Sequence, residues 1–134
     1  MENKLLILDM DETLVHTVHY YEGPEGENKE IKDPYDAKIP IIYSEKKTKY
    51  LFVNFRPYIK EILTKLKSLY RIVVFTASLQ NYADAILNHL DPNYEIFENR
   101  YYRNHCYNTK DRITVKDLRL FEQCNSKNDK NWNL

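Results

Sequence analysis

The segment LLILDMDETLVHT, residues 5–17, decides the expected fold. Its apolar run stops at Asp9, and Asp11, Glu12 and Thr13 follow closely. A short apolar run bounded by charge is typical of a strand buried on both faces, as in a parallel sheet. Ligands of open α/β sheets bind beyond the carboxyl ends of the strands, so these carboxylates lie where a site is expected.

A second strand and a helix continue this pattern. RIVVFTAS, residues 71–78, is rich in β-branched side chains and ends in hydroxyl groups. Between the two runs, residues 56–70 carry apolar side chains at three-four spacing with lysines opposite, which predicts a helix. Pro57 suits the first helical position, because the N–H that it lacks would have no helical partner there.

A second helix is expected from about Leu79 to Leu90, with Ser78 as its N-cap. Asp91-Pro92 ends it, because proline disfavours the helical conformation at the preceding residue. Strand, helix, strand and helix in this order imply right-handed crossovers and an α/β fold, a parallel sheet flanked by helices.

Residues 18–55 interrupt this alternation. A polar loop comes first, and the runs IPIIY and YLFVNF then flank SEKKTK, which predicts a β-hairpin inserted after the first strand. Pro40 favours an edge strand, since proline cannot donate a hydrogen bond to a neighbour. The basic KKTK is expected to be a solvated turn.

The pattern is weaker after Pro92. YEIF and NRYYRNHCYN resemble short strands, and ITVKDLRLF fits either a strand or a helical turn. Residues 122–134 are polar and are expected to form a loop by composition. We expect one domain over residues 1–134.

Composition argues against several classes of protein. The chain is 43% hydrophobic with a formal net charge of zero, which gives no electrostatic support for general nucleic-acid or membrane binding. Two glycines are too few for a glycine-rich phosphate loop. Cys106 and Cys124 lack metal-type spacing, so reduced thiols in an intracellular protein, nuclear or cytoplasmic, are expected. No apolar run reaches about 18 residues, so no membrane span is expected.

Two carboxylates at one strand end can take two different chemical roles. One can stay ionised as a nucleophile or as a ligand of a hard cation such as Mg²⁺, while the other carries a proton. The alternative is structural, because Asp9 and Asp11 also fit a helix N-cap with an acidic first turn. The pair alone does not separate these alternatives.

Four segments in order favour the chemical alternative. DMDETLVH resembles the first motif of the haloacid-dehalogenase (HAD) superfamily, in the version of the FCP/SCP C-terminal-domain phosphatases, which include the NLI-interacting-factor-like proteins. FRPY at 55–58 resembles the arginine-proline before that family's first helix, residues 73–92 its second motif, and residues 104–118 its lysine-bearing third segment. The match covers nearly the whole chain. It implies a HAD-like parallel sheet flanked by helices, with a small hairpin insertion.

The resemblance implies a role for each catalytic residue. Asp9 would attack phosphorus and form an aspartyl-phosphate, and Asp11 would act as general acid and then as general base. Asp9 and Asp11 would also hold Mg²⁺. Thr76 would donate a hydrogen bond to a phosphoryl oxygen, and Lys116 would neutralise charge beside Asp9. Without the resemblance, Lys116 fits a surface ion pair with Asp117 equally well.

Substrate contacts are implied for Thr13, Arg56 and Ser78. Arg56 corresponds to a position near the substrate in the family, whereas Thr13 suits shaping of the turn equally well. The insertion is expected to shape a peptide groove. Four of its side chains are candidates to line that groove: Tyr20, Tyr21, Ile42 and Phe52.

The family uses one more strand, which ends in an Asp-Asp or Asp-Asn pair and supplies a metal ligand. Asp129 follows no apolar run, so it is not accepted as that ligand. We therefore expect a domain truncated at its C-terminus, with weak activity or none of its own.

The predicted function is that of a Mg²⁺-dependent protein serine/threonine phosphatase. Its partner would be a phosphoserine- or phosphothreonine-containing protein or peptide, such as the C-terminal repeats of RNA polymerase II. Neither nucleic acid nor membrane is an expected partner, and a monomer is expected. Two alternatives stay open: a non-catalytic peptide-binding module, as in a translocase receptor of this family, and a small-molecule phosphatase. Retention of Asp9, Thr76 and Lys116 argues against the first, and the absence of a large cap argues against the second.

Overall fold

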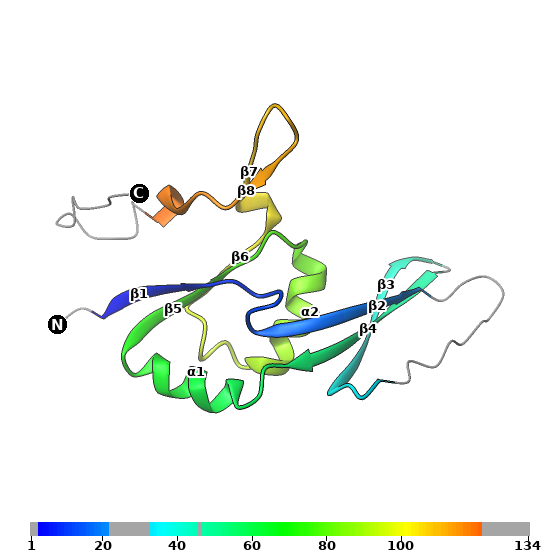
Figure 1. Ribbon diagram of the computed structural model, residues 1–134, viewed down its shortest axis with the longest axis horizontal. Coiled ribbons are helices and arrows are strands. Elements are labelled where there is room, and N and C mark those ends of the chain that lie inside the picture. The colour runs from blue at the N-terminus through cyan, green and yellow to red at the C-terminus, as the bar shows by residue number, and fades with distance from the viewer. Residues whose placement is uncertain (1–2, 22–32, 46, 122–134) are drawn as a thin grey trace.

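The computed structural model describes residues 3–21, 33–45 and 47–121 of the chain (Figure 1). Within these residues the chain forms a parallel sheet, an antiparallel sheet, a small hairpin and two α-helices. In this described part, no helix has the length and apolar character needed to cross a membrane. Most of the predicted polar loop, the tail at 122–134 and Cys124 lie outside the described residues.

The parallel sheet has the order β1-β5-β6 and confirms the predicted α/β class. Its strands are β1 (Lys4–Leu8), β5 (Tyr70–Phe75) and β6 (Asn99–Tyr101). Leu8 pairs with Val74, which brings the carboxyl ends of β1 and β5 to one edge. The expectation that β1 is buried on both faces was confirmed in part. Leu6 and Leu8 pack against one apolar core, and Leu5 and Ile7 pack against a second core on the opposite face. These side chains are only half-buried, and among the described strands β1 pairs only with β5.

Helix α1 (Ile59–Lys67) follows the antiparallel sheet and carries the predicted apolar stripe. Its buried side chains, Ile59 and Leu63, face the core. The helix begins two residues after Pro57, because Tyr58 adopts a left-handed conformation with φ of 62°. The prediction of Pro57 as the first helical residue was therefore wrong.

Helix α2 (Gln80–Leu90) has nearly the predicted bounds but a different N-terminus. Leu79 occupies the N-cap position without a side-chain hydrogen bond to the helix, so the prediction of Ser78 as N-cap was wrong. The Ser78 hydroxyl donates to the carboxylate of Asp11 instead. At the other end Asp91 is the C-cap, as predicted.

Alternate side chains of β5 enter two separate apolar cores. Ile72 and Val74 join the large core with side chains of both helices. Val73 and Phe75 point to the opposite face, where Phe121 covers them. Because side chains alternate along a strand, β5 is buried on both faces. Outside β5, the large-core members that are at most 2% exposed come from the turn after β1, the antiparallel sheet, both helices and the segment after α2: Met10, Leu14, Leu51, Val53, Leu63, Ala83, Ile86, Leu87 and Phe97.

The insertion is a three-stranded antiparallel sheet, larger than the predicted hairpin. β3 (Ala37–Ser44) and β4 (Lys47–Phe55) form the expected hairpin. β2 (Val15–Tyr21) adds a third strand along the other side of β4, so the inserted sheet starts earlier than residue 18. Pro40 lies in β3, which pairs only with β4 among the described strands, as predicted for an edge.

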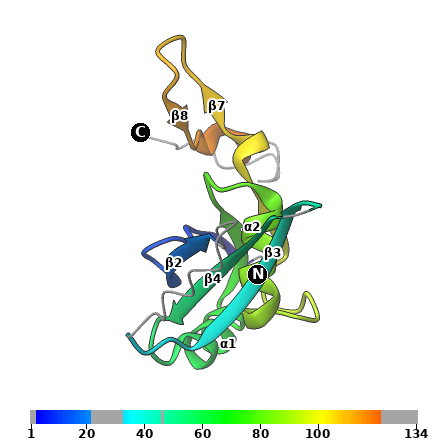
Figure 2. The ribbon, with the colours of Figure 1, turned by 90° about the vertical axis from the view of Figure 1, so that its right-hand side faces the viewer.

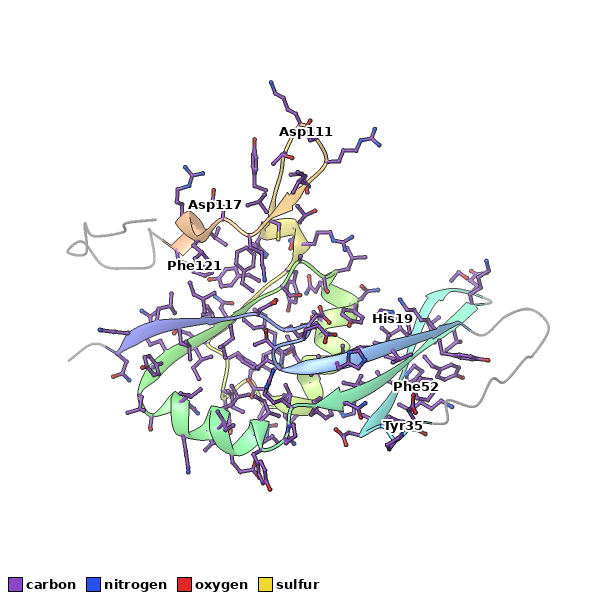
Figure 3. All side chains as sticks on the ribbon, in the orientation of Figure 1. His19, Tyr35, Phe52, Asp111, Asp117 and Phe121 are labelled. Carbon is purple, nitrogen blue, oxygen red and sulfur yellow. The ribbon has the colours of Figure 1, made fainter. Side chains whose placement is uncertain are left out.

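The two faces of the antiparallel sheet have different surroundings. On one face Leu51 and Val53 are fully buried in the large core shared with α2. On the other face Phe52 lies under two aromatic rings, with centroid distances of 6.4 Å to Tyr20 and 4.8 Å to Tyr35 (Figure 3). The sheet therefore uses one face to attach to the body of the protein and the other to hold an aromatic cluster.

The segment after α2 contains a loop where a strand was expected. The backbone N–H groups of Glu95, Ile96 and Phe97 donate to the carboxylate of Asp91 at 2.8, 3.0 and 2.9 Å. Asp91 is only 2% exposed, so this carboxylate satisfies three amides that would otherwise lack partners. The prediction of YEIF as a strand was wrong for this reason.

The last described segments are short elements rather than long strands. NRYYRNHCYN contains β6, a 3₁₀ turn at Arg103–His105 and β7 (Tyr107–Asn108). ITVKDLRLF contains both predicted alternatives, β8 (Thr114–Val115) and a 3₁₀ turn at Leu118–Phe121. β7 and β8 pair in a hairpin that projects from the body (Figure 2).

Replacement of Asp91 by alanine should destabilise the fold. Three backbone N–H groups lose their acceptor, and we expect a loss of about 2–4 kcal/mol in the free energy of unfolding. Urea denaturation of wild type and Asp91→Ala measures this loss. The control is Asp111→Ala at the exposed tip of the β7–β8 hairpin, where a change within about 0.5 kcal/mol is expected. Equal stability of the two variants would contradict the role of Asp91.

Candidate active site

The chain turns sharply at the carboxyl end of β1 and holds both aspartates at the sheet edge. The buried Met10 anchors this turn, because its carbonyl accepts hydrogen bonds from the N–H groups of Leu14 at 2.8 Å and of Thr13 and Val15 at 3.3 Å. Glu12 takes a left-handed conformation with φ of 61°. The turn sends the chain into β2 and leaves the side chains flanking Met10 at the end of the parallel sheet.

Asp9 contacts a lysine that is 107 residues away in the sequence. The Nζ of Lys116 donates to Oδ1 of Asp9 at 2.8 Å, and it also lies 3.4 Å from the carbonyl oxygen of Phe75 at the end of β5. The N–H of Met10 donates to the same Oδ1 at 2.9 Å. The side chains of Asp9 and Lys116 are 44% and 32% exposed, so a ligand can reach both.

The surface pair considered for Lys116 does not form. Asp117 pairs with Arg119 instead, and the hydrogen bonds from Arg119 lower the pKa of the Asp117 carboxyl to about 2. Lys116 is thereby the member of this segment that faces the strand-end aspartate.

The Asp11 carboxylate is held by two hydroxyl groups. Ser78 Oγ donates to its Oδ2 and the Tyr82 phenol donates to its Oδ1, both at 2.8 Å. The ring of His19 stacks on Tyr82 with centroids 5.2 Å apart and an angle of 14° between the planes. Burial, reinforced by the neighbouring Asp11, raises the pKa of Tyr82, so the phenol stays protonated and donating. These contacts fix the orientation of Asp11.

Thr76 directly follows β5 and is 1% exposed. Its N–H donates to the carbonyl of Tyr101 at 2.9 Å, which extends the pairing of β5 with β6. Its Oγ1 accepts a hydrogen bond from the N–H of Ser78 at 3.1 Å. Thr76 therefore shapes the turn that presents Ser78 to Asp11, and its hydroxyl hydrogen remains as a donor.

Arg56 and Thr13 lie on the other side of the first turn. Nε of Arg56 donates to the carbonyl of Thr13 at 2.6 Å, and the Arg56 N–H donates to the carbonyl of Leu14 at 2.9 Å. The two residues line an open cavity of about 270 Å³ together with Glu12 and His16, which are hydrogen-bonded through Oε1 and Nδ1 at 2.7 Å. The predicted substrate-contact residues thus divide between two places, with Arg56 and Thr13 here and Ser78 beside Asp11.

A second cavity of about 260 Å³ lies beside Asp11. Among the described residues, those that line it come from β2, β4, the start of α2 and the segment after β6: Asp11, His19, Lys49, Ser78, Leu79, Tyr82 and Arg103. Sequence reasoning did not assign the other five to the site, namely His19, Lys49, Leu79, Tyr82 and Arg103. Lys49 was expected in a solvated turn, and Tyr82 falls inside the helix predicted from Leu79 to Leu90, where its place in the first turn of α2 brings its hydroxyl to Asp11.

Three of the four predicted groove residues lie away from this cavity. Strand pairing places Tyr20 and Phe52 on one face of the antiparallel sheet, and His19 and Lys49 on the other. Ile42 is opposite Thr48 and shares the face of Phe52, with 78% of its surface exposed. Tyr20, Ile42 and Phe52 therefore do not line the cavity beside Asp11. That they line a peptide groove stays a prediction, and nothing is described for the side chain of Tyr21.

The carboxylates at the strand end are the type of ligand that Mg²⁺ prefers, but few of them are close together among the described residues. Mg²⁺ prefers carboxylate and carbonyl oxygens, which Asp9 and Asp11 provide. In residues 3–21, 33–45 and 47–121, however, no group of three His, Cys, Asp or Glu side chains could hold a metal ion. A Mg²⁺ ion at this edge would keep several of its waters.

Comparison with known proteins identifies relatives that match most of the chain. The family model described as NLI interacting factor-like phosphatase matches residues 4–130. The chain is 35% identical over 121 residues to nuclear envelope morphology protein 1 of Schizosaccharomyces pombe, covering 90% of the chain and 23% of that protein. It is 35% identical over 106 residues to CTD nuclear envelope phosphatase 1B of Danio rerio, covering 79% of the chain and 42% of that protein. The chain thus spans less than half the length of these relatives.

A solved structure confirms the predicted HAD-like fold. The fission yeast RNA polymerase II CTD phosphatase Fcp1, bound to beryllium fluoride, superposes with a TM-score of 0.54 at 20% sequence identity. The superposition covers 77% of this chain and 30% of that chain. At this identity the likeness concerns the arrangement of strands and helices.

Loss of Arg56 should loosen the turn after β1. In Arg56→Ala the Thr13 carbonyl loses its donor, and we expect about 1 kcal/mol lower stability and faster amide hydrogen exchange at Thr13, Leu14 and Val15. Exchange measured by NMR or mass spectrometry tests this. The matched control is Arg71→Ala, which removes an exposed pair with Glu98 at the start of β5. Unchanged exchange in the turn of Arg56→Ala would show that the contact does not hold it.

Proposed function

The chain belongs to the NLI interacting factor-like phosphatase family, and we propose that it is the catalytic part of a protein serine/threonine phosphatase. The observation that carries this proposal is the contact between Lys116 and Asp9 at the sheet edge. A lysine, a strand-end carboxylate and nearby hydroxyl donors are the groups that phosphoryl transfer needs, since its catalysis is mainly positioning and charge stabilisation.

In the proposed first step, a carboxylate oxygen of Asp9 attacks phosphorus. The new oxygen–phosphorus bond makes an aspartyl-phosphate, the bond to the serine or threonine oxygen breaks, and Asp11 gives its proton to that oxygen. In the second step Asp11 takes a proton from water, the water oxygen bonds to phosphorus, and phosphate leaves with the Asp9 carboxylate restored. Lys116 balances the charge that gathers beside Asp9.

Hydrogen-bond donors support these steps. Ser78 and Tyr82 orient Asp11 for both proton transfers, because each holds one of its carboxylate oxygens. Thr76 retains a hydroxyl hydrogen that can be donated to a phosphoryl oxygen. Arg56 and Thr13, on the other side of the turn, are assigned to the substrate-binding surface. The bond from Arg56 to the Thr13 carbonyl supports a positioning role for this pair.

We assign Mg²⁺ as the cofactor, held by the carboxylate of Asp9 and by oxygens of Asp11. When bound, the ion would neutralise negative charge on the phosphoryl group. The oxygen chemistry of this edge supports the assignment, and the small number of protein ligands implies an ion that exchanges readily with solvent.

The substrate is assigned as a phosphorylated protein or peptide. Both cavities are open and shallow, so they suit an extended peptide better than a metabolite that must be enclosed. Fcp1 is titled a phosphatase of the RNA polymerase II CTD, which makes phosphorylated repeats of that kind one candidate substrate. The names of two relatives refer to the nuclear envelope, which supports a nuclear location.

A peptide-binding module without catalysis is the second candidate. It is favoured by the small metal-ligand set of the described residues. The two functions are separated by turnover, because only the phosphatase consumes its phosphopeptide.

Asp9→Asn should abolish hydrolysis while the fold is kept. The amide has nearly the volume of the carboxylate but is a poor nucleophile, so we expect at least about a 1000-fold loss in kcat for p-nitrophenyl phosphate. Asp111→Asn, at the exposed hairpin tip, is the matched control with unchanged kcat. Circular dichroism checks the fold of both variants. Full activity of the Asp9→Asn variant would show that Asp9 is not the nucleophile. If the wild-type protein binds a phosphopeptide but does not hydrolyse it, the binding module is supported instead.

Lys116→Gln should lower the rate of phosphoryl transfer. Loss of the charge beside Asp9 removes stabilisation that exists mainly in the transition state, so we expect about a 100-fold lower kcat with a smaller change in KM. Lys110→Gln, at the exposed tip of the β7–β8 hairpin, is the control and should keep the wild-type rate. A Lys116→Gln enzyme with the wild-type kcat would remove this lysine from the mechanism.

A further inference from the structure

The cavity beside Asp11 is lined mainly by polar and basic groups. Lys49 and Arg103 carry positive charge, Asp11 is its only carboxylate among the described lining residues, and Leu79 is its only aliphatic side chain. Both oxygens of Asp11 already accept hydrogen bonds from Ser78 and Tyr82. Among the described lining residues two side chains are basic and one is acidic, and the acidic one already accepts two hydrogen bonds from the protein.

Arg103 is fixed in place by the turn that precedes α2. Its N–H donates to the carbonyl of Ser78 at 2.9 Å, and its Nε donates to the carbonyl of Ala77 at 2.8 Å. A guanidinium has five N–H donors, so these contacts leave the terminal groups to serve a ligand. Because this anchoring orients the side chain before any ligand binds, less conformational entropy is lost on binding.

Lys49 and His19 form the opposite wall of the cavity. Burial lowers the pKa of His19, and the nearby charge of Lys49 lowers it further. The imidazole is therefore neutral near pH 7, where one of its nitrogens still donates a hydrogen bond. The positive charge of this wall resides on Lys49.

The N-terminus of α2 opens at the same cavity. Leu79 lines the cavity and is the N-cap residue, and its side chain makes no hydrogen bond to the helix. In the first turn, Asn81 Oδ1 accepts the N–H of Tyr82. The first N–H groups of an eleven-residue helix carry partial positive charge, which favours an anion nearby. The helix N-terminus and the two basic side chains each favour an anion in this cavity.

We propose that this cavity binds an anionic side chain of the substrate, next to the residue that is dephosphorylated. The anion is a carboxylate or a second phosphate group, since both accept hydrogen bonds from lysine and arginine. Asp11 belongs both to this cavity and to the reacting pair of aspartates, so the bound side chain comes from a residue close in sequence to the phosphorylated one. The assignment rests on the proposed phosphatase function. It makes the enzyme selective for acidic or multiply phosphorylated segments.

Matched phosphopeptides test this selectivity. Each heptapeptide has a central phosphoserine and neutral flanks, with either glutamate or glutamine at one of the six flanking positions. A second series places a further phosphoserine at the same positions. We expect at least one position where glutamate raises kcat/KM about tenfold over glutamine, as a charge-assisted hydrogen bond allows. A larger effect of phosphoserine than of glutamate would identify the second phosphate as the preferred anion.

Charge variants of β4 link the preference to the cavity. In Lys49→Gln the ratio of kcat/KM between the glutamate and glutamine peptides should fall below about twofold. In Lys49→Glu a lysine peptide should become better than the glutamate peptide. The matched control is Lys47→Gln, two residues earlier on the same strand and outside the cavity, which should keep the wild-type ratio.

The outcomes separate this inference from the proposed function. If wild type hydrolyses p-nitrophenyl phosphate and the neutral phosphopeptide but shows no glutamate preference at any position, the anionic subsite is wrong and the phosphatase stands. The subsite is also wrong if Lys49→Gln keeps the preference. If the full-length wild-type protein hydrolyses neither substrate, the proposed function fails. Fluorescence anisotropy of the same labelled peptides then measures the glutamate preference as binding, and equal affinities overturn the subsite.

Discussion

The pair formed by Asp9 and Lys116 closes the site, but it does not supply the energy that brings its two ends together. Both side chains are substantially exposed, and an ion pair of this kind contributes about 0–1 kcal/mol. Five residues after Lys116, Phe121 is 1% exposed and packs on Phe75 with ring centroids 5.7 Å apart (Figure 3). Burial of such a ring contributes roughly 1.5–3 kcal/mol. Packing on the second face of β5 therefore positions the lysine, and the lysine provides charge at the sheet edge.

Elements with a local signal were predicted well, and elements that depend on distant partners were not. β5 and α2 follow from a β-branched run and from three-four spacing, which any short window of sequence contains. β2 was missed because its sequence, VHTVHYY, shows no clean alternation and is a strand through its pairing with β4, some thirty residues later. The 94–97 segment looked like a strand, but the carboxylate of Asp91 takes its backbone N–H groups.

The candidate site follows the same rule: residues with a local signal were predicted, and their distant partners were not. Strand ends indicated Asp9 and Asp11, and the resemblance to a family implied Thr76 and Lys116. The partners of Asp11 come from residues 67 and 71 positions away, and no spacing rule connects them to it. Ser78 was expected to cap a helix, but a hydroxyl at that place can serve either an amide or a carboxylate. In the fold the Ser78 hydroxyl donates to the carboxylate of Asp11, and Leu79 occupies the N-cap position instead.

The proposed phosphoryl-transfer site lies in a chain with only two glycines, so its sharp turns are made by other residues. Here Glu12 and Tyr58 adopt left-handed conformations, each costing about 1–2 kcal/mol relative to the usual region. The two strained residues flank the same junction, where Arg56 ties the end of β4 to the turn after β1. The Arg56 bonds to the carbonyls of Thr13 and Leu14, with the buried Met10 beneath them, offset that cost. Because strain and restraint act on one turn, the backbone that presents Asp9 and Asp11 has little freedom to relax. The site is thus organised before a substrate arrives, which glycines would not ensure.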